Sequence, residues 1–169
     1  YGNYTDLVND PDLNVIYVAT THNFHYEHAA LCLAANKPVL CEKPMCVNSK
    51  EAQKLVNLSR HKNIFLMEAM WTRFLPAIIR LKKDLDTKII GIPQLVQADF
   101  GITKPLEKGS RFYEKELAAG ALLDLGIYTI NFANIVFGSH PKGISGYAKF
   151  TDQGVDQLST YNLLYSEGR

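Results

Sequence analysis

Short apolar runs alternate with helix-forming segments over the first part of the chain. Residues 15–20 (Val-Ile-Tyr-Val-Ala-Thr) are rich in β-branched and aromatic side chains, which is typical of a strand buried on both faces. Residues 26–35 then place alanine and leucine at helical spacing, and residues 39–41 form a second apolar run. This order of strand, helix and strand predicts a parallel βαβ unit with a right-handed crossover.

The pattern continues beyond the second apolar run. Asn48 with Glu51 three residues later is typical of a capping box at the start of a helix, and residues 64–67 form a third run. Polar side chains follow the three runs at 22–23, 42–44 and 68–69. Because ligands bind beyond the carboxyl ends of parallel strands, we expect a site at this edge of the sheet.

The pattern changes after about residue 90. Residues 94–100 alternate between apolar and polar, which predicts a half-exposed strand, and residues 117–137 form a long apolar segment of helical character. Two strands are predicted at 143–150 and 155–165, joined by a turn. We therefore expect an α/β domain over residues 1–70 and an α+β domain with a mainly antiparallel sheet over residues 71–169.

Composition excludes several classes of protein. The 169 residues carry 18 Lys and Arg against 17 Asp and Glu, so the net charge of +1 offers no basic surface for nucleic acid or an anionic membrane. Unbroken aliphatic runs are far shorter than the roughly 20 residues of a transmembrane helix. The three cysteines are an odd number, which favours free thiols in a reducing, cytoplasmic compartment.

The two ends of the sequence read as interior positions of a longer protein. The chain begins at Tyr1, without a methionine, and it stops in what reads as the middle of a hairpin. We therefore expect part of the functional apparatus to lie outside these residues.

Two charged side chains are candidates for chemistry. Lys43 stands between Glu42 and Pro44 at a strand end, where proline restricts the backbone of the lysine. The alternative is an ordinary surface lysine. Asp124 lies in the otherwise uncharged run 118–127, where a carboxylate requires a cation or a backbone amide as partner.

Tyr128 follows Asp124 by four residues, on the same face of a helix. Gly120 and Gly126 each weaken that helix, which indicates that another group approaches its backbone closely.

Histidine and aromatic side chains are the remaining candidates. His22, His25 and His28 are spaced too widely around a helix for a metal triplet, so proximity to a phosphate or ribose is the better interpretation. Trp71 and Phe74 are either core residues or an apolar wall for a flat ligand.

Three phrases of the sequence are specific enough to suggest a family. They are Val-Leu-Cys-Glu-Lys-Pro-Met at 39–45, Phe-Leu-Met-Glu-Ala-Met-Trp-Thr-Arg-Phe at 65–74 and Gly-Ala-Leu-Leu-Asp-Leu-Gly-Ile-Tyr at 120–128. The chain resembles the glucose–fructose oxidoreductase/inositol dehydrogenase (Gfo/Idh/MocA) family over nearly its whole length. The resemblance implies a Rossmann-type parallel sheet followed by an α+β domain with a large open sheet.

The resemblance also implies roles for individual residues. The wider family has a histidine where this chain has Tyr128, and the branch that shares the tyrosine oxidises cyclic trans-dihydrodiols. The implied catalytic residues are Lys43, Asp124 and Tyr128; the implied substrate pocket contains Trp71 and Phe100; the cofactor-binding residues are Thr20, His22, His25, Glu42 and Lys43.

The implied activity is NADP-dependent oxidation of a secondary alcohol in a trans-dihydrodiol or an aldopentose such as D-xylose. Tyr128 would accept the hydroxyl proton, and a nearby Lys43 ammonium, oriented by Asp124, would favour the phenolate. NADP rather than NAD rests on the family alone, because a glycine-rich phosphate loop would lie outside these residues. The resemblance implies a homodimer formed through the C-terminal sheet. Another sugar oxidoreductase, or a catalytically silent NAD(P)-binding regulator, remains an alternative.

Overall fold

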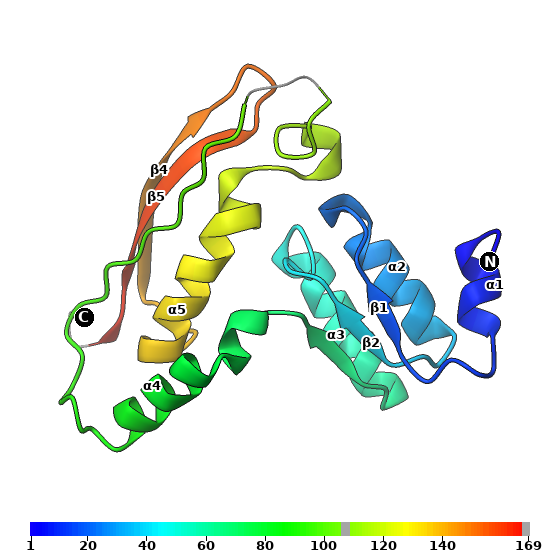
Figure 1. Ribbon diagram of the computed structural model, residues 1–169, viewed down its shortest axis with the longest axis horizontal. Helices are drawn as coiled ribbons and strands as arrows, with labels where there is room; N and C mark the ends of the chain where they lie inside the picture. The colour runs from blue at the N-terminus through cyan, green and yellow to red at the C-terminus, as the bar shows by residue number, and fades with distance from the viewer. Residues whose placement is uncertain (106–108, 167–169) are drawn as a thin grey trace. The chain divides into compact units, whose positions relative to one another are not determined.

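The computed structural model describes residues 1–105 and 109–166 in two compact units. The first unit comprises residues 1–69 with 116–118, and the described part of the second comprises residues 70–105, 109–115 and 119–166. Figure 1 shows their helices and strands.

The first unit is built on a three-stranded parallel sheet. Strands β1 (Ile16–Val18), β2 (Val39–Cys41) and β3 (Leu66–Glu68) follow one another in the order β1-β2-β3. The helices of the unit are α1 (Tyr4–Asn9), α2 (His22–Ala34) and α3 (Ser49–Lys62), and α2 packs against α3, β1 and β2. The predicted parallel βαβ arrangement is confirmed, and α1 is an additional helix that the apolar spacing did not indicate.

Local sequence explains where α3 begins and ends. The Asn48 side chain accepts a hydrogen bond from the backbone N–H of Glu51 at 3.0 Å, as the capping pattern predicted. At the other end Asn63 adopts the left-handed conformation with φ of 53°, which ends the helix. Between these caps, Leu55 is fully buried in the core.

The three cysteines are free thiols, as predicted. Cys32 and Cys41 are buried in the core of the first unit, and Cys46 packs against it. Burial raises the pKa of Cys41 to about 12 and that of Cys46 to about 12, with smaller contributions from nearby acidic groups. These thiols are therefore protonated at neutral pH and poor nucleophiles, which gives them a packing role.

The second unit begins with the short 3-10 helix η1 (Trp71–Phe74) and helix α4 (Pro76–Asp86). A π-helical turn, η3 (Leu122–Gly126), leads directly into α5 (Ile127–Phe137), which ends at Gly138 with φ of 88°. Strands β4 (Gly143–Phe150) and β5 (Asp156–Leu164) form an antiparallel pair. The predicted hairpin and the predicted end of the helix are thus confirmed, whereas α4 was not anticipated.

Residues 94–100 are not a strand, contrary to the prediction. The segment lies beside β5 (Figure 1), and both line the same two grooves, but no strand pairing is formed by residues 91–105. Leu95 is 74% exposed and Phe100 is 48% exposed. The alternating pattern indicates an extended segment correctly, but it carries no information on whether a hydrogen-bonding neighbour lies alongside.

Residues 115–137 are not one continuous helix, although they are long and apolar enough in composition to cross a membrane. The segment starts with the 3-10 turn η2 (Lys115–Leu117), and then Ala118 and Gly120 have φ values of 54° and 131°. Two positive φ values interrupt the helical hydrogen bonds, so the regular helix is limited to η3 and α5. Apolar composition alone therefore overstates the length of the helix.

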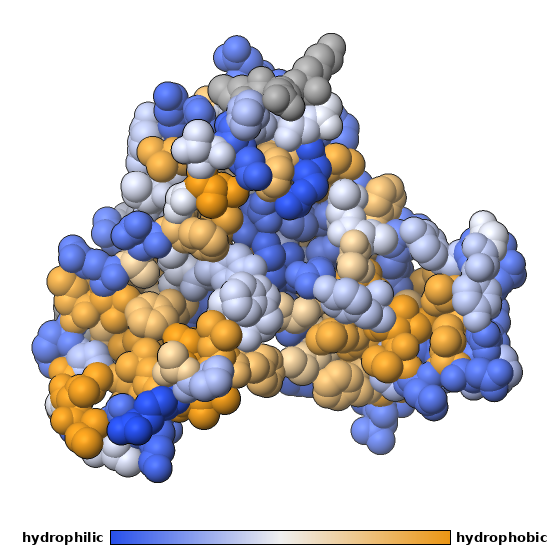
Figure 2. All heavy atoms as spheres, in the orientation of Figure 1, coloured by the Kyte–Doolittle hydropathy of each residue, from blue (hydrophilic) through white to orange (hydrophobic). Residues whose placement is uncertain are grey.

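Apolar side chains are exposed along α4 and the segment that follows it. Figure 2 shows hydrophobic residues gathered over this region, at the lower left of the view. Its exposed members are Ile79, Ile89, Ile90, Ile92 and Leu95. A continuous apolar surface of this kind is typical of a contact surface.

Candidate active site

The carboxyl ends of the three parallel strands bring polar side chains to one edge of the first unit. Thr20 follows β1, Glu42 and Lys43 follow β2, and Glu68 ends β3. All four positions lie at the edge where α/β sheets bind their ligands. The sequence predicted this edge from polar clusters at 22–23, 42–44 and 68–69, of which the second and third contain Glu42, Lys43 and Glu68.

The loop that carries Lys43 is held by hydrogen bonds on both sides of the lysine. The backbone N–H of Lys43 donates to Glu42 Oε2 at 3.1 Å, and the Lys43–Pro44 peptide bond is cis. The backbone N–H of Met45 donates to Glu68 Oε1 at 2.8 Å. The backbone N–H groups of this loop are therefore held by the carboxylates of Glu42 and Glu68.

Glu42 also accepts a hydrogen bond from the hydroxyl of Tyr17 on β1. This bond, together with burial, raises the pKa of Tyr17 above its ordinary value. Tyr17 thereby remains a phenol at neutral pH and acts as a donor that fixes the orientation of the Glu42 carboxylate. Sequence analysis did not single out Tyr17, because it belongs to the apolar run of β1.

His25 connects two of these strand ends. Its side chain is fully buried; Nδ1 lies 2.7 Å from the carbonyl oxygen of Pro44, and Nε2 lies 2.9 Å from that of Thr20. Both ring nitrogens thus contact backbone oxygens, and the ring holds the end of β1 next to the Lys43 loop. The structure gives His25 a positioning role within the first unit, and contact with a cofactor stays a prediction.

Replacing His25 with alanine should lower the free energy of unfolding by about 2–4 kcal/mol, because the Pro44 and Thr20 carbonyl oxygens lose their contacts with the ring and a cavity remains. Urea unfolding followed by circular dichroism measures the change. The matched control is His61→Ala at an exposed position near the end of α3, which should change stability by less than about 0.5 kcal/mol. Equal effects of the two substitutions would contradict this role of His25.

The other two histidines of α2 also bond within the first unit. His22 Nδ1 lies 3.0 Å from the carbonyl oxygen of Ala118, and His28 Nδ1 lies 3.1 Å from Thr20 Oγ1. Within residues 1–105 and 109–166, no group of three His, Cys, Asp or Glu side chains could hold a metal ion.

Asp124 lies on the π-helical turn of the second unit. Its side chain is 16% exposed, and Oδ2 lies 4.0 Å from a terminal nitrogen of Arg111. Within the second unit, Arg111 is therefore a cation partner of Asp124. Sequence analysis did not identify Arg111, because it lies 13 positions before Asp124 and has no helical spacing to it.

The start of this turn is held by Asp156 of β5. Asp156 Oδ2 accepts a hydrogen bond from the backbone N–H of Leu122 at 2.7 Å. Gly120, with φ of 131°, lies so close that a Cβ atom there would clash with Asp156 Oδ1. The predicted close approach to the backbone at Gly120 is thus confirmed, and the approaching group is the carboxylate of Asp156.

Burial raises the pKa of Asp156, while its hydrogen bonds lower it by less. A carboxyl with a higher pKa in the folded state binds its proton more tightly there, so it stabilises the fold most below its unfolded pKa of about 3.8. This contribution should fall as the pH rises through the folded pKa. Asp156→Asn should remove this dependence, and urea unfolding from pH 4 to 8 should show the stability difference between the two proteins changing with pH. A constant difference would contradict the prediction.

Tyr128 is the centre of an aromatic group on the second unit. The indole N–H of Trp71 donates to the Tyr128 hydroxyl oxygen at 3.0 Å, and the two ring centroids are 6.1 Å apart. The Phe100 ring lies edge-on to Tyr128 with centroids 5.4 Å apart. Trp71 is 54% exposed and Phe100 is 48% exposed, so these rings form an accessible wall instead of a core. The structure thus brings three predicted site residues together.

Arg73 and Asn131 fix the position of Trp71 beside α5. A terminal nitrogen of Arg73 on η1 donates to Asn131 Oδ1 at 2.7 Å, and Asn131 is buried at 8% exposure. A buried amide on an apolar helix requires such a partner. In the sequence, the sign of this bond is Asn131 itself, because an amide within an apolar run indicates that a hydrogen-bond partner is needed.

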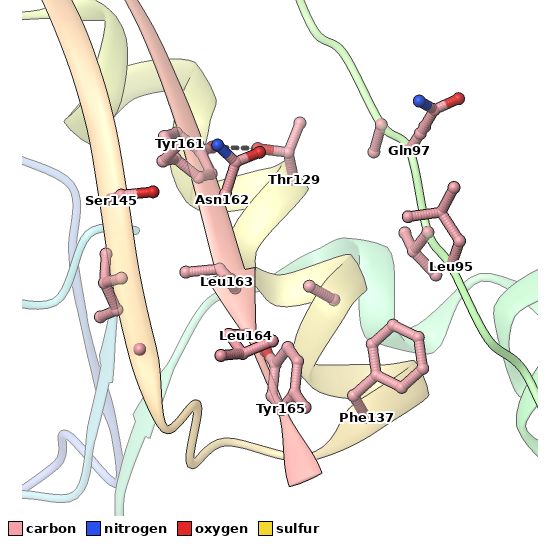
Figure 3. Close-up of a pocket in the computed structure, with 15 residues that line it drawn as sticks. Leu95, Gln97, Thr129, Phe137, Ser145, Tyr161, Asn162, Leu163, Leu164 and Tyr165 are labelled. Carbon is pink, nitrogen blue, oxygen red and sulfur yellow. Dashed lines mark hydrogen bonds between the residues drawn. The ribbon is translucent and has the colours of Figure 1, made fainter. Parts of the chain in front are cut away.

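Two grooves lie on the second unit, and the smaller one is lined in part by Phe100 and by Leu125 and Gly126 of the turn that carries Asp124. The larger, of about 640 Å³, runs between residues 95–98 and the α5, β4 and β5 elements (Figure 3). The smaller, of about 400 Å³, lies next to residues 98–102. The described lining of the larger groove includes no Asp, Glu, Lys, Arg, His or Cys. Its titratable side chains are the phenols of Tyr161 and Tyr165.

Comparisons with known proteins identify both parts of the chain. Residues 1–70 match the oxidoreductase family with a NAD-binding Rossmann fold, and residues 78–169 match the GFO/IDH/MocA C-terminal domain. The chain is similar to an aldose-aldose oxidoreductase from Caulobacter crescentus solved with glycerol, with a TM-score of 0.90 and 25% identity over 99% of this chain and 52% of that one. A 3-ketoreductase from Actinomadura kijaniata, solved in complex with NADP and TDP-benzene, has a TM-score of 0.79 at 25% identity, over 98% of this chain and 51% of that one.

Curated relatives are more similar in sequence. The trans-1,2-dihydrobenzene-1,2-diol dehydrogenase of Danio rerio is 42% identical over 170 residues, which cover 100% of this chain and 50% of the relative. The Bos taurus enzyme of the same name is 43% identical over 99% of this chain and 50% of that protein. The chain thus spans about half the length of these relatives. On these matches, the chain belongs to the Gfo/Idh/MocA oxidoreductase family.

Proposed function

We propose that the protein oxidises a secondary alcohol of a cyclic trans-dihydrodiol or an aldopentose such as D-xylose, with NADP as the hydride acceptor. The observation that carries this proposal is the Tyr128 hydroxyl, which accepts a hydrogen bond from Trp71 and lies edge-on to Phe100. A proton-transferring group within an exposed aromatic wall suits a small cyclic substrate. The names of the curated relatives support a trans-dihydrodiol as the substrate.

Cofactor binding is proposed at the strand edge of the first unit. The parallel sheet and the start of α2 at His22 fit a dinucleotide, because backbone N–H groups at a helix start attract its phosphates. Thr20, His22, Glu42 and Lys43 are proposed to contact it, and His25 to hold their loops. When bound, the nicotinamide supplies the acceptor for the hydride. NADP is favoured by the resemblance and by a related 3-ketoreductase solved with NADP.

The residues of this chain handle the proton of the alcohol. Tyr128 is proposed to accept the hydroxyl proton as the hydride departs, which leaves a carbonyl product. The indole N–H of Trp71, 3.0 Å from the phenol oxygen, stabilises negative charge there. We propose that Lys43 supplies the positive charge that favours the phenolate, and that Asp124 helps to orient the lysine.

Turnover by the intact purified protein tests the proposal. We expect reduction of NADP⁺ with trans-1,2-dihydrobenzene-1,2-diol or D-xylose, followed at 340 nm, and weaker reduction of NAD⁺. Oxidation of other sugars alone would favour the alternative of a different sugar oxidoreductase. Dinucleotide binding by calorimetry without turnover of any diol or sugar would refute the proposal and favour a silent regulator.

We also propose that the protein is a cytoplasmic homodimer formed through the C-terminal sheet. Tyr147, Leu158 and Leu164 are 72%, 56% and 52% exposed on β4 and β5, and Leu158 and Leu164 point to the same face of β5 as Tyr147 does on β4. Exposed apolar side chains on one face of a sheet suit contact with a second copy of the same face. Light scattering of the intact protein should give twice the mass of one chain, and a monomeric mass would contradict the dimer.

A further inference from the structure

The π-helical turn that carries Asp124 is hydrogen-bonded to β5 at both of its ends. Asp156 bonds the start of the turn, and Tyr161 bonds its end. The hydroxyl of Tyr161 donates to the carbonyl oxygen of Gly126 at 2.8 Å, and Thr129 Oγ1 donates to the same oxygen at 2.8 Å. The hydroxyls of Tyr161 and Thr129 also contact each other, as the dashed line in Figure 3 shows. Gly126 is the last residue of the π-helical turn, so these bonds lie where the turn becomes α5.

The close approach at Gly126 depends on the absence of a side chain. A Cβ atom at Gly126 would lie 3.1 Å from the Tyr161 hydroxyl and 3.1 Å from Leu122 Cδ1. The predicted approach of another group to the Gly126 backbone is thereby explained, as it is at Gly120. Together, Asp156 and Tyr161 of one strand contact both ends of the turn.

Backbone hydrogen bonding defines the geometry of this turn. The Ile127 N–H donates to the carbonyl oxygen of Leu122, five residues earlier, which is π-helical rather than α-helical spacing, and it also contacts the carbonyl oxygen of Leu125. Both Tyr161 and Thr129 line the two grooves of the second unit, so open space adjoins the pair on two sides. Side-chain hydroxyls that bond a helix carbonyl alter the local course of the helix.

We infer that Tyr161 is a positioning residue, which fixes the π-helical turn through the Gly126 carbonyl and thereby places Asp124 and Tyr128 for proton transfer. Asp124 lies two residues before Gly126 and Tyr128 lies two residues after it. A change from π-helical to α-helical spacing at Gly126 would rotate these side chains relative to each other. The effect on the reaction rests on the proposed function. The claim that Tyr161 fixes the π-helical turn does not depend on it.

Tyr161→Phe removes one hydroxyl and keeps the ring, and Tyr4→Phe on α1 is the matched control because Tyr4 is 54% exposed. In the intact protein, at a temperature where both variants are folded, Tyr161→Phe should lower kcat at least tenfold. The KM for the alcohol and the Kd for NADPH should change less than threefold. Amide hydrogen exchange of residues 122–128 should become at least tenfold faster, with unchanged exchange in β1–β3. The control should change none of these quantities.

Thr129→Val serves as a second variant that loses the other hydroxyl and keeps the branched shape; it should show the same pattern with a smaller loss. A kcat within threefold of the original, in a folded variant with a lower melting temperature, would overturn the inference and leave Tyr161 a stabilising residue only. Unchanged exchange at 122–128 would overturn it as well. If the unmodified protein turns over no alcohol, the proposed function fails, and the exchange comparison alone decides whether Tyr161 fixes the turn.

Discussion

Tyr128→Phe is expected to lower kcat for alcohol oxidation by about 10³-fold, within the range of 10²–10⁴ that general acid–base groups contribute. The substitution removes only the hydroxyl proposed to accept the proton. Trp71, which donates to that oxygen, is 54% exposed and can donate to water instead, so the fold should be retained. Steady-state kinetics gives kcat, and fluorescence titration should show NADPH affinity within threefold of the original.

Two further variants make this result specific to Tyr128. Tyr4→Phe, at an exposed position on α1, should retain full activity. Tyr128→His should retain part of the activity and move the rising limb of the pH–rate profile to lower pH, because a histidine ordinarily titrates at about 6.5 and a phenol at about 10. Equal activity of the phenylalanine and histidine variants would show that Tyr128 serves packing only.

Lys43→Met should lower kcat by about 10²-fold or more without unfolding the protein. The side chain keeps its length and loses its charge, while the loop is held by the backbone N–H groups of Lys43 and Met45 on Glu42 and Glu68. The melting temperature should therefore stay within a few degrees of the original, and kinetics under saturating cofactor measures the loss in kcat.

The matched control is Lys54→Met on the exposed face of α3, which removes the same charge at a site without chemistry. It should leave kcat unchanged. Near-normal turnover of Lys43→Met would exclude Lys43 from the catalytic group, and a loss shared by both variants would point to the net charge of the protein instead.

The sequence predicted the elements whose signals are local. The apolar runs of β1–β3 and the capping residue Asn48 act on residues adjacent to them in the sequence. The parallel sheet and the start of α3 could therefore be predicted. The segment 94–100 has an equally regular pattern, but strand formation depends on a pairing partner that the pattern does not specify.

The supporting contacts of the candidate site were less accessible to sequence analysis. Gly120 and Gly126 indicated that something approaches the helix, yet the approaching residues, Asp156 and Tyr161, follow more than thirty positions later on β5. Arg111 reaches Asp124 from a segment without regular structure. Such partners are set by tertiary folding, which brings together residues that have no periodic relation in the chain.

A double-mutant cycle tests the central claim that Lys43 and Tyr128 belong to one proton-transferring group. Single-turnover rates of alcohol oxidation are measured for the unmodified intact protein, for Lys43→Met, for Tyr128→Phe and for the double variant, all saturated with NADP⁺. If the two side chains act together, the double variant should be no more than about threefold slower than the slower single variant. Losses that multiply, so that the double variant falls by the product of the two single effects, would contradict the account.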